Sequence, residues 1–220
     1  MRHPTPILFA LGVTAVLLAA CAPQASPGAS TPRPTMTASP SATTPPSAPA
    51  RIVVLIDGLE YVHGEDTATA PYDDAQAVLE LLKEATGELP DPTEVEDLPG
   101  YEMNLVSYAW DGLTVVTDTG GTGRARVVVS AADVDGSPVV TEEGLSVGAS
   151  RSDLIDAGGW DGWDENGDGI ADYLGVGHQE APGTTSLSRP GETGIQYVMF
   201  ALTDDVVTRI SAPANDYSDL

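Results

Sequence analysis

An acidic segment with glycines holds the residues with the clearest chemical pattern in this sequence. Counting Asp164 as position one, side-chain oxygens fall at positions one, three, five and nine. The expected ligands are Asp164, Asn166, Asp168 and Asp172, with the backbone carbonyl of Ile170 at position seven. Alternate spacing turns several hard oxygens toward one point, and calcium is held by such oxygens at about 2.4 Å. Gly169 stands at position six, where calcium loops turn sharply, so the pattern predicts a structural calcium site.

This segment is similar to the D-x-D/N-x-D-G-x-x-D loops of thrombospondin type 3 and dockerin-like repeats, and the resemblance implies a bound calcium ion. The sequence departs from those families at position twelve, where they have another acid and this chain has Gly175. Asp161, Glu180 or water would then have to complete the shell. The alternative interpretation is a series of Asx-type turns with solvated carboxylates.

A second pattern, at residues 144–148, matches the G-x-S-x-G nucleophile elbow of serine hydrolases, with Ser146 as nucleophile and His178 further along the chain. That fold needs a large parallel sheet, whereas hairpins precede Ser146, and no His-Gly-Gly segment supplies an oxyanion hole. We therefore expect a non-enzymatic protein without catalytic residues, with a serine hydrolase as the less favoured alternative. His63 and His178 have no His or Cys at ligand spacing, so both are expected to be solvated loop residues rather than zinc ligands.

Trp160 and Trp163 flank Asp161 in the acidic segment. If both indoles were exposed and coplanar, they would stack on sugar rings, and the domain would be a calcium-dependent glycan-binding module. The favoured interpretation is that one tryptophan packs into the core while the other covers the loop. Trp110, at the end of a predicted hairpin, is expected to lie in the core.

The N-terminal part predicts export and attachment to a membrane. An apolar stretch from Ile7 to Ala20 follows Arg2, and it is shorter than the roughly 20 residues that a membrane-spanning helix needs. Leu18, Ala19 and Ala20 lead directly into Cys21, the single cysteine. These residues resemble the lipobox of bacterial lipoproteins, which implies removal of a signal peptide, residues 1–20, and attachment of diacylglycerol and palmitate at Cys21. The chain resembles lipoproteins of high-GC Gram-positive bacteria, a resemblance that implies a place on the cell membrane but no activity.

Residues 21–50 are expected to form a disordered tether, because almost all of them are Ala, Pro, Ser or Thr. Residues 51–220 then form a single extracytoplasmic α+β domain. This domain has all 33 acidic residues and seven of the nine basic ones, a net charge of −26. Nucleic acid is excluded as a partner, because its phosphates would be repelled. The expected partners are the membrane, through the lipid on Cys21, and a cell-wall glycan or an envelope protein.

Turn residues between apolar runs predict three hairpins in the domain, around Asp57-Gly58, Asp111-Gly112 and Thr203-Asp204-Asp205. The expected hairpins pair 52–56 with 59–62, 103–110 with 113–117, and 196–202 with 206–210, and further strands are expected at 124–131 and 145–147. Apolar residues at helical spacing predict helices at 73–86 and 150–157. A long loop, which includes residues 160–182, is expected between the second helix and the last hairpin.

The order of these elements predicts an α+β fold: an antiparallel sheet of hairpins with helices on one face, built as two degenerate strand-helix-strand-strand modules. Residues 144–154, G-L-S-V-G-A-S-R-S-D-L, form a turn that enters a short helix. This turn resembles an element of outer-membrane assembly lipoproteins and of β-lactamase inhibitor proteins, and the resemblance favours binding or assembly over catalysis. The sequence thus predicts a lipid-anchored binding or scaffolding domain.

Overall fold

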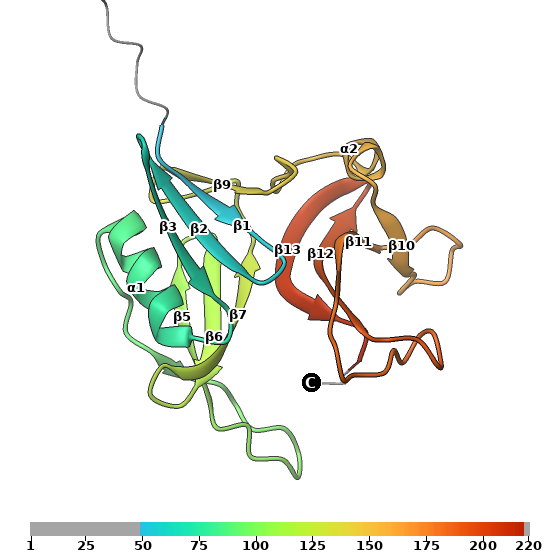
Figure 1. The fold of residues 1–220 in the computed structure, drawn as a ribbon, viewed down its shortest axis with the longest axis horizontal. Helices are drawn as coiled ribbons and strands as arrows, with labels where there is room; N and C mark the ends of the chain where they lie inside the picture. The colour runs from blue at the N-terminus through green and yellow to red at the C-terminus, as the bar shows by residue number, and fades with distance from the viewer. Residues whose placement is uncertain (1–48, 218–220) are drawn as a thin grey trace, which may run out of the picture. The chain divides into compact units, whose positions relative to one another are not determined.

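The computed structural model describes residues 49–217 (Figure 1). The predicted signal peptide, Cys21 and almost all of the predicted tether lie outside these residues. Internal contacts divide the chain into two units, and every described residue belongs to the second, residues 45–220. In the part of the chain that is described, no helix is both long enough and apolar enough to cross a membrane.

A five-stranded sheet contains the first three strands and a later hairpin (Figure 1). Its strands are β1 (Arg51–Val54), β2 (Gly58–His63), β3 (Asp66–Pro71), β8 (Asp133–Val134) and β9 (Ser137–Thr141), in the order β3-β2-β1-β9-β8. The hairpin predicted for 52–62 is present, but its turn is centred on Ile56 and Asp57, because the amide of Leu55 donates to the carbonyl of Gly58 (2.9 Å). The turn predicted at Asp57-Gly58 is therefore wrong by one residue, since Gly58 is the first residue of β2. Strand β9 runs parallel to β1, whereas the other described strand pairs are antiparallel.

Helix α1 (Ala75–Thr86) confirms the helix predicted at 73–86. The side chain of Asp74 accepts a hydrogen bond from the amide of Ala77 (3.1 Å), which caps the first turn. Gly87 ends the helix with a φ of 87°, a conformation that glycine adopts without strain. Val78 and Leu82 lie one turn apart on the same face and are fully buried. This helix contacts β2, β3 and β7, so it joins the small sheet to the larger one.

The larger sheet has eight antiparallel strands in the order β10-β11-β12-β13-β7-β6-β5-β4. They are β4 (Thr93–Glu94), β5 (Leu105–Trp110), β6 (Leu113–Asp118), β7 (Thr122–Val129), β10 (Trp160–Trp163), β11 (Tyr173–Glu180), β12 (Ile195–Thr203) and β13 (Val206–Asn215). Strands β4 to β7 follow α1, and strands β10 to β13 follow α2 (Arg151–Asp156). The last strands of these two halves, β7 and β13, pair at the centre of the sheet. The predicted α+β fold of antiparallel hairpins is therefore confirmed, although the strands form two sheets rather than one.

Helix α2 confirms the helix predicted at 150–157, and its start follows from two side chains. The hydroxyl of Ser150 accepts from the amide of Asp153 (3.3 Å), and the carboxylate of Asp153 accepts from the amide of Ser150 (2.8 Å). This reciprocal capping box satisfies two amides that would otherwise lack partners. Leu154 buries the inner face of this short helix.

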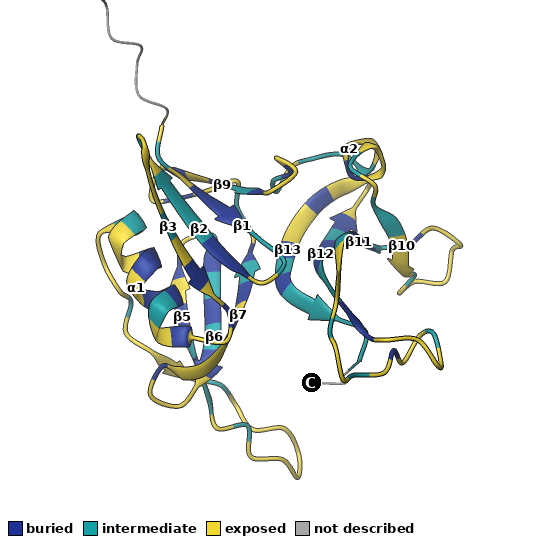
Figure 2. Ribbon diagram, in the orientation of Figure 1, coloured by how far each residue is buried: buried dark blue, intermediate teal, exposed yellow. Residues whose placement is uncertain are grey.

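Buried residues alternate with half-buried or exposed residues along the strands of the larger sheet (Figure 2), so its two faces differ in burial. Tyr108, Val115 and Val127 are paired across neighbouring strands and point to the inner face, where they share one core with α1 and the small sheet. The opposite face, called the open face below, carries half-buried residues such as Val116, Val128 and Met199. Alternate residues of each strand thus bury one side of the sheet and leave the other side partly exposed.

The strand predicted at 145–147 is wrong, because these residues form a loop before α2. Leu145 is buried, and its carbonyl accepts from the amide of Thr141 (2.8 Å), which closes a turn rather than a strand ladder. The apolar character of residues 145–147 therefore reflects the side chain of Leu145, which fills the core, and not a strand.

The long loop predicted at 160–182 is also wrong, because it contains β10 and β11. Gly175 and Gly177 interrupt the apolar alternation of β11, so the period of the strand is not visible in the sequence. A Cβ atom at Gly175 would overlap the indole of Trp160, which explains why glycine occupies this strand position. Strands β3, β4, β8 and β9 were not predicted either.

Candidate functional site

The larger sheet opens between its two central strands. Strand β13 pairs with β7 only at residues 210–212. The next residue of β13 is Pro213, which has no amide hydrogen with which to continue the ladder. On the β7 side, the amide of Ala125 donates to the carbonyl of Tyr72 (2.7 Å), which belongs to the segment leading into α1. The ends of β7 and β13 therefore form a fork with different partners on its two sides.

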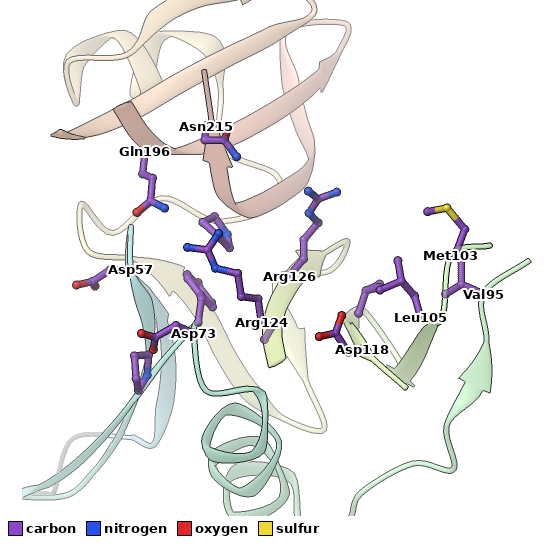
Figure 3. A pocket seen from close by; sticks show the side chains of 15 residues that line it. Asp57, Asp73, Val95, Met103, Leu105, Asp118, Arg124, Arg126, Gln196 and Asn215 are labelled. Atoms are coloured by element: carbon purple, nitrogen blue, oxygen red, sulfur yellow. The ribbon is translucent and has the colours of Figure 1, made fainter. Parts of the chain in front are cut away.

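A cavity of about 620 Å³ lies at this fork, called the fork cavity below (Figure 3). Its walls come from the β1–β2 turn, the segment before α1, the chain between β4 and β5, strands β5 to β7, and the ends of β12 and β13. The volume falls in the range that is typical of small-molecule sites.

Arg124 and Arg126 supply the positive charge of the fork cavity. They are two residues apart on β7, so both side chains project from the same face of the strand. Figure 3 shows their guanidinium groups extending toward the wall that carries Gln196 and Asn215. Within residues 49–217, neither guanidinium forms a hydrogen bond or an ion pair.

Apolar and acidic side chains complete the lining. The apolar part is formed by Val95, Met103, Leu105 and Val116, which lie to one side of the arginines in Figure 3 or next to them in the sheet. The acidic part is formed by Asp57, Asp73 and Asp118, which are all exposed. The cavity therefore presents the guanidinium donors of two arginines beside an apolar wall and an exposed acidic rim.

Tyr72 lines the cavity as a neutral group. Its ring is buried, and its hydroxyl donates to the carbonyl of Leu55 (3.3 Å). Burial, and secondly the negative charge of Asp57, raise the pKa of this phenol well above its usual 10. Tyr72 therefore holds the segment before α1 in place and stays in its neutral form near neutral pH.

The predicted calcium ligands lie together in the loop between β10 and β11, where they bond to the loop's own backbone. Asp164 accepts from the amides of Gly167 (2.6 Å) and Gly169 (2.8 Å). Asn166 and Asp168 accept from the amides two residues ahead, at 2.9 and 2.8 Å, the second of which is the amide of Ile170. Asp172 closes the loop by accepting from the amide of Glu165 (2.8 Å).

These bonds are the Asx-type turns of the alternative interpretation. Asp161 and Glu180, which were expected to complete a calcium shell, belong to β10 and β11. Among the described side chains, no group of three His, Cys, Asp or Glu is placed so that it could hold a metal ion. The calcium site stays a prediction.

Ser146 and His178 are not joined by a hydrogen bond. His178 lies in β11, and Ser146 lies in the loop before α2. Because residues 145–147 form this loop, the strand that leads into a nucleophile elbow is missing there. The prediction that both histidines lie in loops is wrong: His63 belongs to β2, where it stacks on Tyr61 with ring centroids 6.1 Å apart. Both histidines are exposed because they occupy outward positions near strand ends.

Trp160 and Trp163 both lie in β10 but differ in burial. Trp160 is half-buried over Gly175, and its ring meets that of Tyr197 edge-on, with centroids 5.2 Å apart and planes at 63°. It packs on the open face of the sheet, so the prediction that one of this pair enters the core is wrong. Trp163 is 66% exposed, and no ring contact joins the two indoles in the described chain. Trp110 is buried, as predicted.

Sequence reasoning did not single out Arg124 and Arg126. The available signal was their spacing, two residues apart in a predicted strand of a domain that has only seven basic residues. The cavity itself depends on the divergence of β7 and β13, which are far apart in the sequence. No protein-family model, no curated protein and no solved structure matches the chain.

Proposed function

We propose that this chain is a lipid-anchored protein of the cell envelope whose domain binds a ligand without transforming it. The observation that carries the proposal is the fork cavity, where two arginines that have no ion pair within residues 49–217 lie beside an apolar wall. Small-molecule sites usually combine an apolar concave surface with a few fixed polar groups.

The residue types of the cavity favour binding over catalysis. Its lining, taken from the described part of the chain, includes no Ser, Thr, Cys, Lys or His. Covalent catalysis commonly uses one of these groups as a nucleophile beside a base. The guanidinium groups of Arg124 and Arg126 only donate hydrogen bonds, which suits recognition of a ligand.

Filling the cavity tests this proposal. Val116→Trp would place a bulky ring on the apolar wall, whereas Val128→Trp would place the same ring on the open face outside the cavity. We expect compounds from a mixed neutral, anionic and cationic library to shift amide NMR signals around the fork in the wild type and in Val128→Trp, and not in Val116→Trp. Equal binding by both variants would locate the ligand site elsewhere and contradict the proposal.

Attachment to the membrane is proposed from the lipobox-like residues 18–21. The thiol of Cys21 would carry the lipid, so Cys21→Ser is expected to abolish incorporation of an alkyne-labelled palmitate during growth. Ala22→Ser, one residue further on, is the control and should keep the label. A wild-type chain that is secreted without label would show that the segment is an ordinary signal peptide.

We also propose that the loop at residues 164–172 binds one structural calcium ion. The proposal is supported by the alternate spacing of its oxygens and by the length of exposed chain that an ion would order. Calcium at a hundred times its dissociation constant would stabilise the fold by about 2.7 kcal/mol. Calorimetric titration of calcium, with thermal melting beside it, is expected to give saturable binding and a higher melting temperature.

The matched variants for this titration are in the same loop. Asp164→Ala combined with Asp168→Ala removes two predicted ligands and should abolish binding. Glu165→Ala removes a carboxylate at position two, whose side chain accepts from the hydroxyl of Tyr173 (3.2 Å), and should leave calcium binding within a few-fold of wild type. Absence of binding at millimolar calcium would leave the loop as a set of Asx turns.

A further inference from the structure

We infer that the fork cavity takes a monomeric anionic amphiphile, in which a carboxylate, sulfonate or phosphate head is joined to an acyl or aryl body. The inference rests on the proposed binding function and adds to it the chemical class of the ligand. Its basis is the juxtaposition of Arg124 and Arg126 with the apolar wall of the cavity.

Two arginines without ion pairs in the described structure are unexpected in a domain with this excess of acidic residues. Residues 51–220 carry 33 acidic side chains and seven basic ones. Carboxylate partners are therefore abundant, yet Arg124 and Arg126 form no ion pair in the described structure. Their Cα atoms are about 7 Å apart along one strand, so the two like charges repel each other. A bound anion between them would replace this repulsion by two attractions.

The geometry of guanidinium groups indicates the head of the ligand. Each group presents several N–H donors in one plane, which fits the paired oxygens of a carboxylate, sulfonate or phosphate. Asp57, Asp73 and Asp118 also line the cavity, and they would repel an extended polyanion. A ligand with one compact anionic head at the arginines satisfies both conditions.

The apolar wall indicates the body of the ligand. Val95, Met103, Leu105 and Val116 are all half-buried, so each still exposes apolar surface that a ligand can cover. Covering this surface is favourable in water, and the flexible Met103 can adapt to an acyl or an aryl group. An inorganic anion would use the arginines and leave this wall exposed, so we expect it to bind much more weakly.

Two fluorescent probes separate the contributions of head and body. 8-Anilinonaphthalene-1-sulfonate has an anionic head and an aryl body, and N-phenyl-1-naphthylamine has the same body without the charge. Both probes would be titrated into residues 21–220, the chain that remains after the predicted cleavage. Cys21→Ser in this chain prevents attachment of the lipid. The matched variants are Arg124→Gln and Arg126→Gln in the cavity, and Arg209→Gln on β13 outside it.

The sulfonate probe is expected to bind saturably with one probe per chain. Arg124→Gln and Arg126→Gln should each weaken it at least about tenfold, because each removes a hydrogen bond to a charged group. Arg209→Gln should stay within twofold of wild type. The neutral probe should bind more weakly and should not respond to either cavity variant. All three arginines are exposed, so circular dichroism is expected to show unchanged folds.

The contrary outcomes distinguish this inference from the function on which it rests. If both probes bind equally well, are blocked by Val116→Trp and ignore the arginine variants, the cavity binds ligands but the anionic class is wrong. If neither probe nor any library compound binds at the fork, the proposed function itself fails. Vesicles of phosphatidylglycerol test whether the anion belongs to a bilayer instead. The inference would be overturned if the chain sedimented with the vesicles, if this sedimentation depended on Arg124, and if the monomeric probe did not bind. The arginines would then be assigned to a bilayer surface.

Discussion

Phe200→Ala is expected to lower the free energy of unfolding by about 3–5 kcal/mol. Phe200 is the largest fully buried side chain among the described residues. It lies on β12 between Leu174 of β11 and Ile210 of β13, which are also fully buried. Truncation would remove most of its buried apolar surface and leave a void, because neighbouring strands cannot collapse into the space of one ring. Urea denaturation followed by circular dichroism would measure the loss.

Met199→Ala is the matched control for this prediction. Met199 is the preceding residue of the same strand, but it points to the open face opposite Gly175 and Ser211 and is half-buried. We expect a loss of about 1 kcal/mol from the apolar surface that it covers. Similar losses for the two substitutions would contradict the assignment of an inner and an open face to the larger sheet. That assignment matters for function, because Arg126 and Val116 of the fork cavity are on the open face.

Local signals in the sequence were sufficient for many of the individual elements. The Asp111-Gly112 turn joins β5 to β6 in the predicted hairpin, with a φ of 90° at Gly112, because such dipeptides adopt the turn that the twist of paired strands requires. Strands β1 and β2 also form the predicted hairpin, although their turn lies one residue earlier than Asp57-Gly58. The two helices begin directly after Asp74 and Ser150, whose side chains cap the first turn. All of these signals act over a few residues, so they are visible without knowledge of the fold.

Signals that act between distant segments were not visible. The glycine at position 175 reads as a loop residue, yet it lies in a strand because Trp160 covers it from the neighbouring strand. Strand β9 pairs in parallel with β1, although about half of the domain's sequence separates them. This pairing joins β8 and β9 to the first three strands and so forms the five-stranded sheet. Neither fact follows from propensity or from period, because each depends on which strands become neighbours.

The candidate site is a product of the same distant pairing. The position of Pro213 in β13 explains why the pairing with β7 ends there, but the sequence does not tell which strand lies opposite. The sequence shows Arg124 and Arg126 as two basic residues on one side of a predicted strand. It does not show that they lack carboxylate partners among the described residues. The predicted calcium loop differs from the fork cavity, because its residues lie close together in the sequence and their pattern was evident there. The structure places these residues in one loop, and calcium binding stays a prediction.

Asp216→Ala is expected to lower the free energy of unfolding by about 2 kcal/mol at pH 7. The side chain of Asp216 is 11% exposed, and it accepts hydrogen bonds from the hydroxyl of Ser186 (2.5 Å), from Arg189 (3.2 Å) and from the amide of Ile195 (2.6 Å). These bonds fasten the loop between β11 and β12 to the end of β13, beside the fork cavity. Removal of the carboxylate would leave the buried hydroxyl of Ser186 with only the more distant hydroxyl of Ser188 (3.3 Å) as an acceptor.

Glu192→Ala tests whether this loss comes from the carboxylate network or from Arg189 alone. Glu192 is the other ionic partner of Arg189 (3.0 Å), but its side chain is 60% exposed, so we expect a change of less than about 0.5 kcal/mol. Urea denaturation of the two variants beside the wild type would compare them. A loss for Glu192→Ala as large as that for Asp216→Ala would contradict the role given to Asp216.

The effect of Asp216→Ala should also depend on pH in one direction. Burial acts to raise the pKa of Asp216, but the hydrogen bonds from Ser186, the amide of Ile195, Arg189 and Ser188 outweigh it, and the pKa lies below its usual 3.8. A carboxyl with a lowered pKa stabilises the fold above its unfolded pKa, and this contribution is lost as the pH falls through the folded value. The difference between wild type and Asp216→Ala should therefore be constant from pH 5 to 7 and should narrow at about pH 3 and below. A difference that widens in acid would mean that the protonated form of Asp216 is the one that the loop between β11 and β12 stabilises.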